Sequence, residues 1–82
     1  MKRAQVYALI DAERERQREK WRGQHAWGSG DCSSAGIAPI VKAVVLAEEC
    51  GEVARAILER NDPLEELVQV AAVAVAWIEG ME

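Results

Sequence analysis

The sequence predicts an all-α fold: a short antiparallel bundle of about three helices in a single domain over residues 1–82. Residues 3–22 contain no Gly or Pro and are rich in strong helix formers. Two further stretches, from Pro39 to about Arg60 and from about Pro63 to Glu79, carry apolar residues in helical patterns. A chain this short buries only a marginal core by itself, so we expect oligomerisation to complete the bundle.

The first predicted helix ends in a run of charges, ERERQREK, from Glu13 to Lys20. Such runs usually form a solvated face with ion pairs along the helix, such as those of Glu15 with Arg16 and Lys20. The alternative is that Arg16 and Lys20 reach a polyanionic ligand. The sequence alone favours the solvated face.

Residues 23–36 hold four of the six glycines and are predicted to form a loop. No Gly-Lys-Ser/Thr follows these glycines, so the loop lacks a Walker A pattern. A Gly/Ser loop can still bind phosphate through backbone N–H groups, although that pattern alone is weak support. His25 and Trp27 lie here, and they either pack against the helices or stack on and hydrogen-bond a base.

The second helix is predicted to begin at Pro39, which suits a first helical turn. Its apolar stripe at helical spacing consists of Ala43, Leu46, Cys50, Val53 and Ile57, with Cys50 expected to be a small buried residue. An adjacent stripe consists of Val45, Glu49, Glu52 and Ala56. Gly51 costs about 1 kcal/mol relative to Ala in a helix, so we expect a backbone or a ligand to approach it closely.

Asn61-Asp62-Pro63 predicts a turn, with Asp62 and Glu65 forming a capping box for the third helix. From Val70 to Ile78 that helix is apolar on all sides, which predicts burial on more than one side. Two short helices cannot surround it, so we expect a second copy of the chain to cover it in a homo-oligomer, a dimer or tetramer. Gly80 is expected to end the helix as a C′ residue.

Composition argues against several functional classes. The net charge of −4 does not favour binding to a nucleic-acid backbone. The N-terminus lacks the long apolar run of a signal peptide, and the nine apolar residues 70–78 are fewer than half of a membrane span. Cys32 and Cys50 make no metal-binding motif. We therefore expect a soluble cytoplasmic protein with no membrane or nucleic-acid partner.

The candidate chemistry lies in four oxygen-bearing side chains. Glu49 and Glu52 are three residues apart on the second helix, and Glu66 and Gln69 are three apart on the third, so each pair shares a helix face. In an antiparallel hairpin the two pairs can oppose each other and form an oxygen-rich pocket suited to Mg²⁺ or Mn²⁺. The alternative is four ordinary solvent-facing residues.

These residues carry a resemblance to a known family. The segments EECGEV (48–53) and ELVQ (66–69) resemble the EExxE…ExxD signature of MazG-like all-α nucleoside triphosphate pyrophosphohydrolases. Thirteen residues separate Glu52 from Glu66, which fits the family spacing. The segment ERERQREKWRGQHAW is similar to the one that precedes the signature in phage- and actinobacterial-type members, so the resemblance covers about Ala8 to Glu79.

The resemblance implies Mg²⁺-dependent hydrolysis of a nucleoside triphosphate (an NTP or dNTP) to the monophosphate and pyrophosphate. The carried-over roles are catalytic for Glu48 and Glu49, and metal-binding for Glu49, Glu52, Glu66 and Gln69. Gln69 stands where the signature has Asp and offers only a neutral oxygen, so we expect weaker metal binding or fewer ions. Candidate contacts to phosphate and base, which the signature does not include, are Arg16, Lys20, Trp21, His25 and Trp27. The alternative function is a non-catalytic oligomerisation module or a nucleotide-binding pseudoenzyme.

Overall fold

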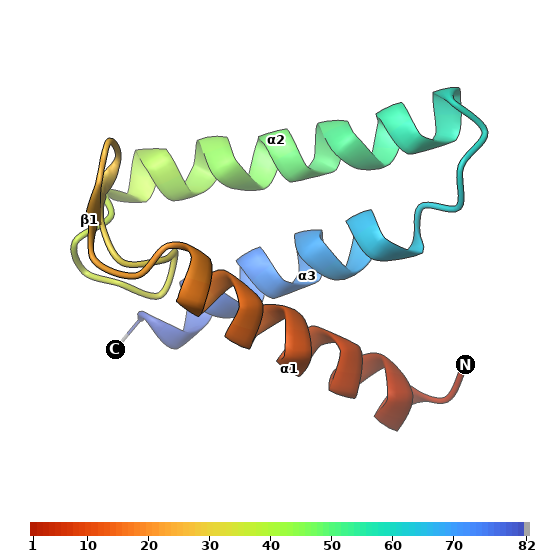
Figure 1. The fold of residues 1–82 in the computed structure, drawn as a ribbon, viewed down its shortest axis with the longest axis horizontal. Coiled ribbons are helices and arrows are strands. Elements are labelled where there is room, and N and C mark those ends of the chain that lie inside the picture. The colour runs from red at the N-terminus through yellow and green to blue at the C-terminus, as the bar shows by residue number, and fades with distance from the viewer. Residues whose placement is uncertain (82) are drawn as a thin grey trace.

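The computed structural model describes residues 1–81, which form three helices and one small pair of antiparallel strands (Figure 1). The elements are α1 (Arg3–Lys20), β1 (Gln24–His25), β2 (Gly28–Ser29), α2 (Pro39–Leu58) and α3 (Leu64–Glu79). All three predicted helices are confirmed, with ends within two residues of those expected. The predicted helical architecture is confirmed, and the predicted loop additionally contains the short β1–β2 pair.

Helix α3 is the central element, because it packs against both α1 and α2 (Figure 1). The apolar core is built from small residues: Ala56 of α2, Ala72, Val73 and Ala76 of α3, and Ile37 of the loop are buried. Among the described residues, none of the large side chains is fully buried. Small side chains let the helices approach closely, but they leave a thin core.

The β1–β2 ladder closes the loop before α2. Gln24 pairs with Ser29, and His25 with Gly28. Gly28 has a φ of 138°, and a Cβ at this position would overlap the carbonyl oxygen of Gly36. Only glycine fits both the left-handed backbone and the close approach. Strands of two residues have no hydrophobic period, so the sequence could not reveal them.

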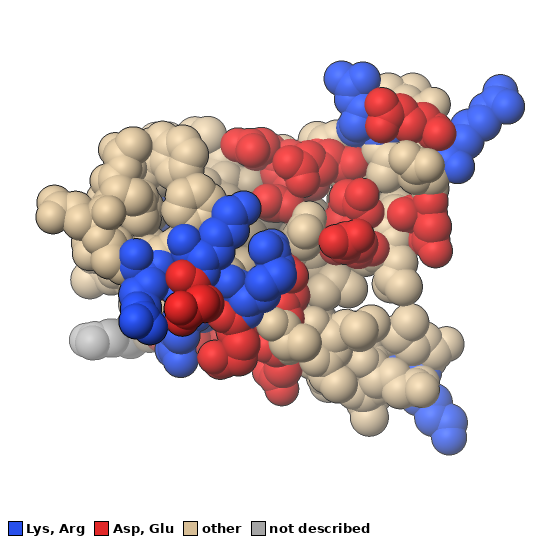
Figure 2. Space-filling view, viewed as in Figure 1, with Lys and Arg blue, Asp and Glu red and all other residues tan. Residues whose placement is uncertain are grey.

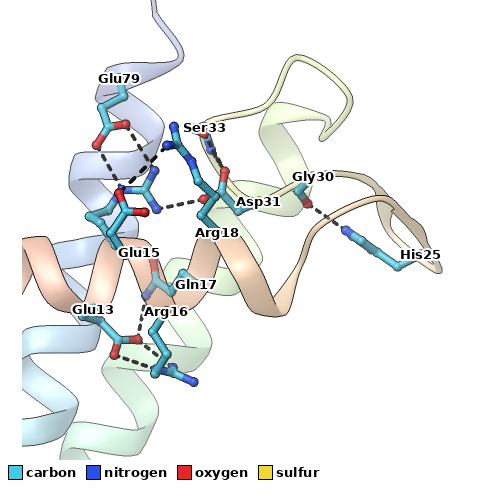
Figure 3. A network of polar contacts seen from close by, with 11 residues as sticks. Glu13, Glu15, Arg16, Gln17, Arg18, His25, Gly30, Asp31, Ser33 and Glu79 are labelled. Atoms are coloured by element: carbon cyan, nitrogen blue, oxygen red, sulfur yellow. Dashed lines mark hydrogen bonds and ion pairs between the residues drawn. The ribbon is translucent and has the colours of Figure 1, made fainter.

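A buried ion network joins α1, the loop and the end of α3 (Figure 3). The Arg14 guanidinium donates to Asp31 Oδ2 at 2.8 Å and to Glu79 Oε1 at 3.0 Å. Asp31 Oδ1 also accepts the backbone N–H of Ser33 at 3.0 Å. Gly80 lies beside this network, where a Cβ would be 2.6 Å from the Ser33 carbonyl oxygen. Its φ of −78° is not left-handed, so Gly80 is required for close packing, not as the predicted C′ residue.

The start of α3 differs from the predicted capping box. The N-cap is Pro63, which has no side-chain hydrogen bond, and the Leu64 N–H donates to Asp62 Oδ1 at 3.0 Å. The helix therefore begins one residue later than expected, after an Asx-type turn. Glu65 is exposed in the first turn, where an acid is favourable beside the helix N-terminus.

The predicted core stripe of α2 is wrong at Cys50 and Ile57, while Ala43, Leu46 and Val53 are half-buried. Lys42 and Ala56 are the buried residues of this helix, Cys50 is exposed and Ile57 is 59% exposed. Helix α2 carries apolar residues around most of its circumference, so the period alone could not select the face that α3 covers. Gly51 is exposed, and a Cβ there would have nothing within 4 Å, so no backbone of the described chain approaches it.

Helix α3 is covered on two sides by α1 and α2, but Val75 and Ile78 remain exposed. The expectation of burial on more than one side is therefore confirmed, while a third side is open to solvent. None of the helices in residues 1–81 is both long enough and apolar enough to cross a bilayer.

Candidate functional site

A cleft of about 530 Å³ lies where α1, the loop, α2 and α3 meet. This volume is within the range of small-molecule sites. Its lining divides into an acidic wall, a basic rim and an aromatic end. The acidic side chains gather over α2 and the basic ones over the C-terminal part of α1, on the face shown in Figure 2.

The acidic wall contains Glu48, Glu49 and Glu52 from α2, with Gln69 from α3 beside them. Glu66 does not line the cleft but lies one turn before Gln69 on the same helix. The structure thus brings three of the four predicted metal-binding residues to one cleft. Within residues 1–81, no group of three or more His, Cys, Asp or Glu side chains is arranged to hold a metal ion.

Two carboxylate oxygens near this wall are buried without a hydrogen-bond partner among the described residues: Oε2 of Glu49 and Oε2 of Glu66. Burying an ionised carboxylate oxygen away from water costs free energy, unless a nearby cation or a hydrogen-bond donor compensates the charge or a proton neutralises it. The two oxygens belong to α2 and α3, which pack against each other. Glu49 on the cleft wall and Glu66 beside it are thus the two side chains of the described residues whose buried oxygens lack a hydrogen-bond partner.

Burial raises the pKa of Glu49 above its ordinary value, and the neighbouring charges of Glu52 and Glu48 raise it further. The positive charge of Lys20, which lines the cleft from α1, lowers the pKa of Glu49 by a smaller amount. The surroundings of Glu49 therefore disfavour the charged form of its carboxylate. A divalent cation at this position would relieve the repulsion.

Glu49→Gln is expected to raise the melting temperature at pH 7 in metal-free buffer. Since the pKa of Glu49 is higher in the folded protein than in the unfolded chain, folding favours its protonated form. The ionised carboxylate lowers the free energy of unfolding as pH rises above about 4.5, the ordinary value. The difference between wild type and variant should vanish near pH 4 in calorimetric melts. A variant that melts lower than wild type at pH 7 would contradict the buried, uncompensated charge.

The basic rim consists of Arg16 and Lys20 from the last turns of α1. Arg16 is engaged with Glu13 by bonds of 2.7 and 2.6 Å (Figure 3). Those hydrogen bonds raise its guanidinium pKa, with a smaller contribution from the charge of Glu49. Arg16 therefore lies within the electrostatic field of the acidic wall.

The charge run of α1 thus has different roles on different faces. Its exposed pairs are Glu15 with Arg18 at 3.9 Å and Glu19 with Arg22 at 3.3 Å. Each joins residues three apart, and the predicted pairing of Glu15 with Arg16 and Lys20 is wrong, because Glu15 pairs with Arg18. The solvated face is real, but Arg16 and Lys20 turn toward the cleft instead.

The aromatic end contains Trp21 and Trp27, with ring centroids 5.3 Å apart. Lys20 Nζ lies 5.2 Å from the Trp21 ring centroid, a cation–π distance. Trp27 is 57% exposed and Trp21 is half-buried. An exposed indole beside a second indole provides a surface on which a planar ring can stack.

His25 does not line the main cleft; it lines a smaller hollow of about 50 Å³ beside Trp21 and Trp27. Its Nε2–H donates to the Gly30 carbonyl oxygen at 2.8 Å, and its Nδ1 accepts the Trp27 backbone N–H at 3.2 Å. Both ring nitrogens are therefore used, and His25 holds Trp27 in place. Its hydrogen-bond partners are loop residues, while its ring centroid also lies 5.2 Å from that of Trp21 at the end of α1.

Sequence reasoning missed several residues of the cleft. Val45 and Val41 line it one and two turns before Glu48. The residues 41, 45, 48 and 52 are four, three and four apart, so they share one face of the helix. This spacing could have identified the two valines as cleft residues from the sequence. Cys32 also lines the cleft, and burial, with the charge of Asp31, raises its thiol pKa. The place of Cys32 in the cleft could not be predicted from the sequence, because it depends on how the loop folds.

The chain matches no protein-family model, no curated protein and no solved structure.

Proposed function

We propose that this protein is a metal-dependent nucleoside triphosphate pyrophosphohydrolase, which converts an NTP or dNTP to the monophosphate and pyrophosphate. The observation that carries the proposal is the pair of partnerless buried oxygens on Glu49 and Glu66, which belong to packed helices beside a cleft with basic and aromatic walls. A nucleotide offers a planar base and a multiply charged phosphate chain, so it suits those two walls.

The donor types suit Mg²⁺ or Mn²⁺, which prefer carboxylate oxygens and water, although within residues 1–81 these carboxylates are not arranged around one ion position. Glu49, Glu52 and Glu66 would hold the ion, and Gln69 would add a neutral oxygen. When bound, the ion neutralises phosphate charge and acidifies a coordinated water. The buried oxygens support this role because an ion would supply the partner that each one lacks.

The phosphate chain is assigned to the basic rim. Arg16 and Lys20 line the same cleft as Glu49 and would offset the negative charge that accumulates when nucleotide and carboxylates meet. The base is assigned to the Trp21–Trp27 end, with His25 positioning Trp27 through its backbone. This arrangement orients the nucleotide along the cleft.

The reaction adds the oxygen of a water molecule to the α-phosphorus and breaks the bond from that phosphorus to the oxygen bridging to the β-phosphorus. Pyrophosphate leaves with the electron pair of the broken bond. Glu48, which is exposed on the cleft wall, would act as the general base that accepts a proton from the attacking water. Glu49, beside it, would be one of the carboxylates that hold the ion.

A second candidate function is nucleotide binding without hydrolysis, by a pseudoenzyme of the same fold. Gln69 favours it, because a neutral side chain stands where a fourth carboxylate would add charge and basicity. The same cleft would then bind the nucleotide, and the carboxylates would hold the ion that accompanies the triphosphate.

The test is pyrophosphate release from a panel of NTPs and dNTPs, with Mg²⁺, with Mn²⁺ or with EDTA. We expect release of pyrophosphate and monophosphate only with a divalent ion, and faster release for one base than for the others. Release of inorganic phosphate instead would contradict cleavage at the α-phosphorus. Nucleotide binding by calorimetry with no release would leave the pseudoenzyme as the function.

A further inference from the structure

One exposed face of α2 is apolar along its whole length. We call this face the outer stripe. It consists of Ile40, Val44, Ala47, Gly51, Ala54 and Leu58, all of them exposed. Successive members are four, three, four, three and four residues apart, so they form one continuous line along the helix. None of them is charged, and Ile40 and Leu58 are 71% and 79% exposed.

The exposed area of the chain exceeds the average for a folded monomer of its mass. The described structure exposes 5901 Å² for 9.0 kDa. Folded monomers of that mass expose about 4,850 Å². The excess of about 1,000 Å² is close to the roughly 800 Å² that each partner buries in a stable interface. The area therefore calls for one partner of ordinary interface size.

We propose that this partner is a second copy of the chain, with its own α2 packed antiparallel on the outer stripe. Reversing the direction of the helix aligns the stripe with itself. Ile40 then faces Leu58 of the second copy, Val44 faces Ala54, and Ala47 faces Gly51. A two-fold interface requires this self-complementarity, because the same surface patch serves both chains.

The size pattern of the stripe suits close helix packing. Its small residues lie near the middle, and its largest lie at the two ends. Two helices can therefore approach most closely at their centres, while Ile40 and Leu58 seal the ends of the contact. This also accounts for Gly51, which disfavours the helix and has no close neighbour within its own chain.

The interface would border the candidate cleft. Ile40 and Val44 line the cleft and also begin the outer stripe. A second copy on the stripe would therefore lie at the cleft rim. The inference rests on the exposed stripe and the exposed area, and it stands whether or not the chain hydrolyses a nucleotide.

Sedimentation equilibrium tests the assembly. We expect wild type at about 18 kDa, twice the chain mass, and Ala47→Glu and Ala54→Glu at the monomer mass. Ala12→Glu is the matched control: it adds the same charge to an exposed alanine of α1 and should remain dimeric. A monomeric wild type, or a dimer that survives both stripe substitutions, would overturn the proposal.

Cross-linking gives a second measurement, which does not depend on how well the charged variants fold. Cys50 is exposed beside the middle of the stripe. An antiparallel pairing brings it near Cys50 of the second copy, on the same flank of the two paired helices. In Cys32→Ser protein, a short bismaleimide should produce a covalent dimer at low protein concentration. Absence of the covalent dimer from folded, dimeric protein would exclude this pairing.

Discussion

Glu49→Gln is expected to slow pyrophosphate release by about 1,000-fold. Gln has nearly the same shape as Glu, but it lacks the negative charge that would bind a divalent cation. Glu49 lines the cleft and has a buried oxygen without a partner, so its charge is the one that the site most depends on. Turnover is measured as pyrophosphate release at saturating Mg²⁺, with helicity monitored by circular dichroism.

The matched control is Glu59→Gln, which removes the same charge from the exposed C-cap of α2, outside the cleft lining. It should retain wild-type turnover. If Glu49→Gln retains turnover while both proteins are fully helical, the reaction does not depend on this carboxylate, and the active site lies elsewhere.

The same variant separates metal binding from catalysis. An ion that binds only the folded protein stabilises it by about 2.7 kcal/mol at a hundred times its Kd, which is a rise in Tm of about 10 °C or more for a domain of this size. We expect that rise for wild type with Mg²⁺ or Mn²⁺, and little or none for Glu49→Gln. Equal rises in wild type and Glu49→Gln would place the ion away from Glu49.

Asp31→Ala is expected to lower the free energy of unfolding by about 3–5 kcal/mol, the cost of leaving one partner of a buried ion pair uncompensated. The side chains of Arg14 and Asp31 are each only 6% exposed, so removing the carboxylate leaves the guanidinium buried with Glu79 alone. In a protein with so thin a core, most of the stability would be lost. Urea unfolding followed by circular dichroism measures the change.

Glu15→Ala is the control for Asp31→Ala. Glu15 pairs with Arg18 at 3.9 Å, and both side chains are mostly exposed, so its removal should change the free energy of unfolding by less than about 0.5 kcal/mol. Similar losses for the two variants would contradict a stabilising role that depends on burial.

The Arg14–Asp31 pair also predicts acid sensitivity. Burial opposes ionisation of Asp31, but hydrogen bonds from Ser33 and Arg14 outweigh it and hold the pKa below the ordinary value of 3.8. The pair therefore contributes its full stability above pH 3.8 and loses it as the pH falls through the lowered pKa of the folded state. Asp31→Ala should show a weaker dependence of stability on pH in this range.

The extent of the helices was predictable from local sequence. Residues 3–20 lack helix breakers, Pro39 opens α2, and the Asn61–Pro63 turn precedes α3. The antiparallel direction of α2 and α3 followed from the short turn. The same reasoning placed Glu49, Glu52 and Gln69 on faces that could meet, and all three line one cleft. Helical period and turn chemistry are local properties, so one sequence was enough.

Only the tertiary structure decided which faces turn inward and which charges are buried. Helix α2 is apolar around most of its circumference, so its period did not show that Ala56 is buried while Cys50 and Ile57 are exposed. Arg14 stands in a run of similar charges, and its partners Asp31 and Glu79 lie 17 and 65 residues away. Contacts between distant segments depend on how the helices dock, and a pattern within one helix does not contain that information.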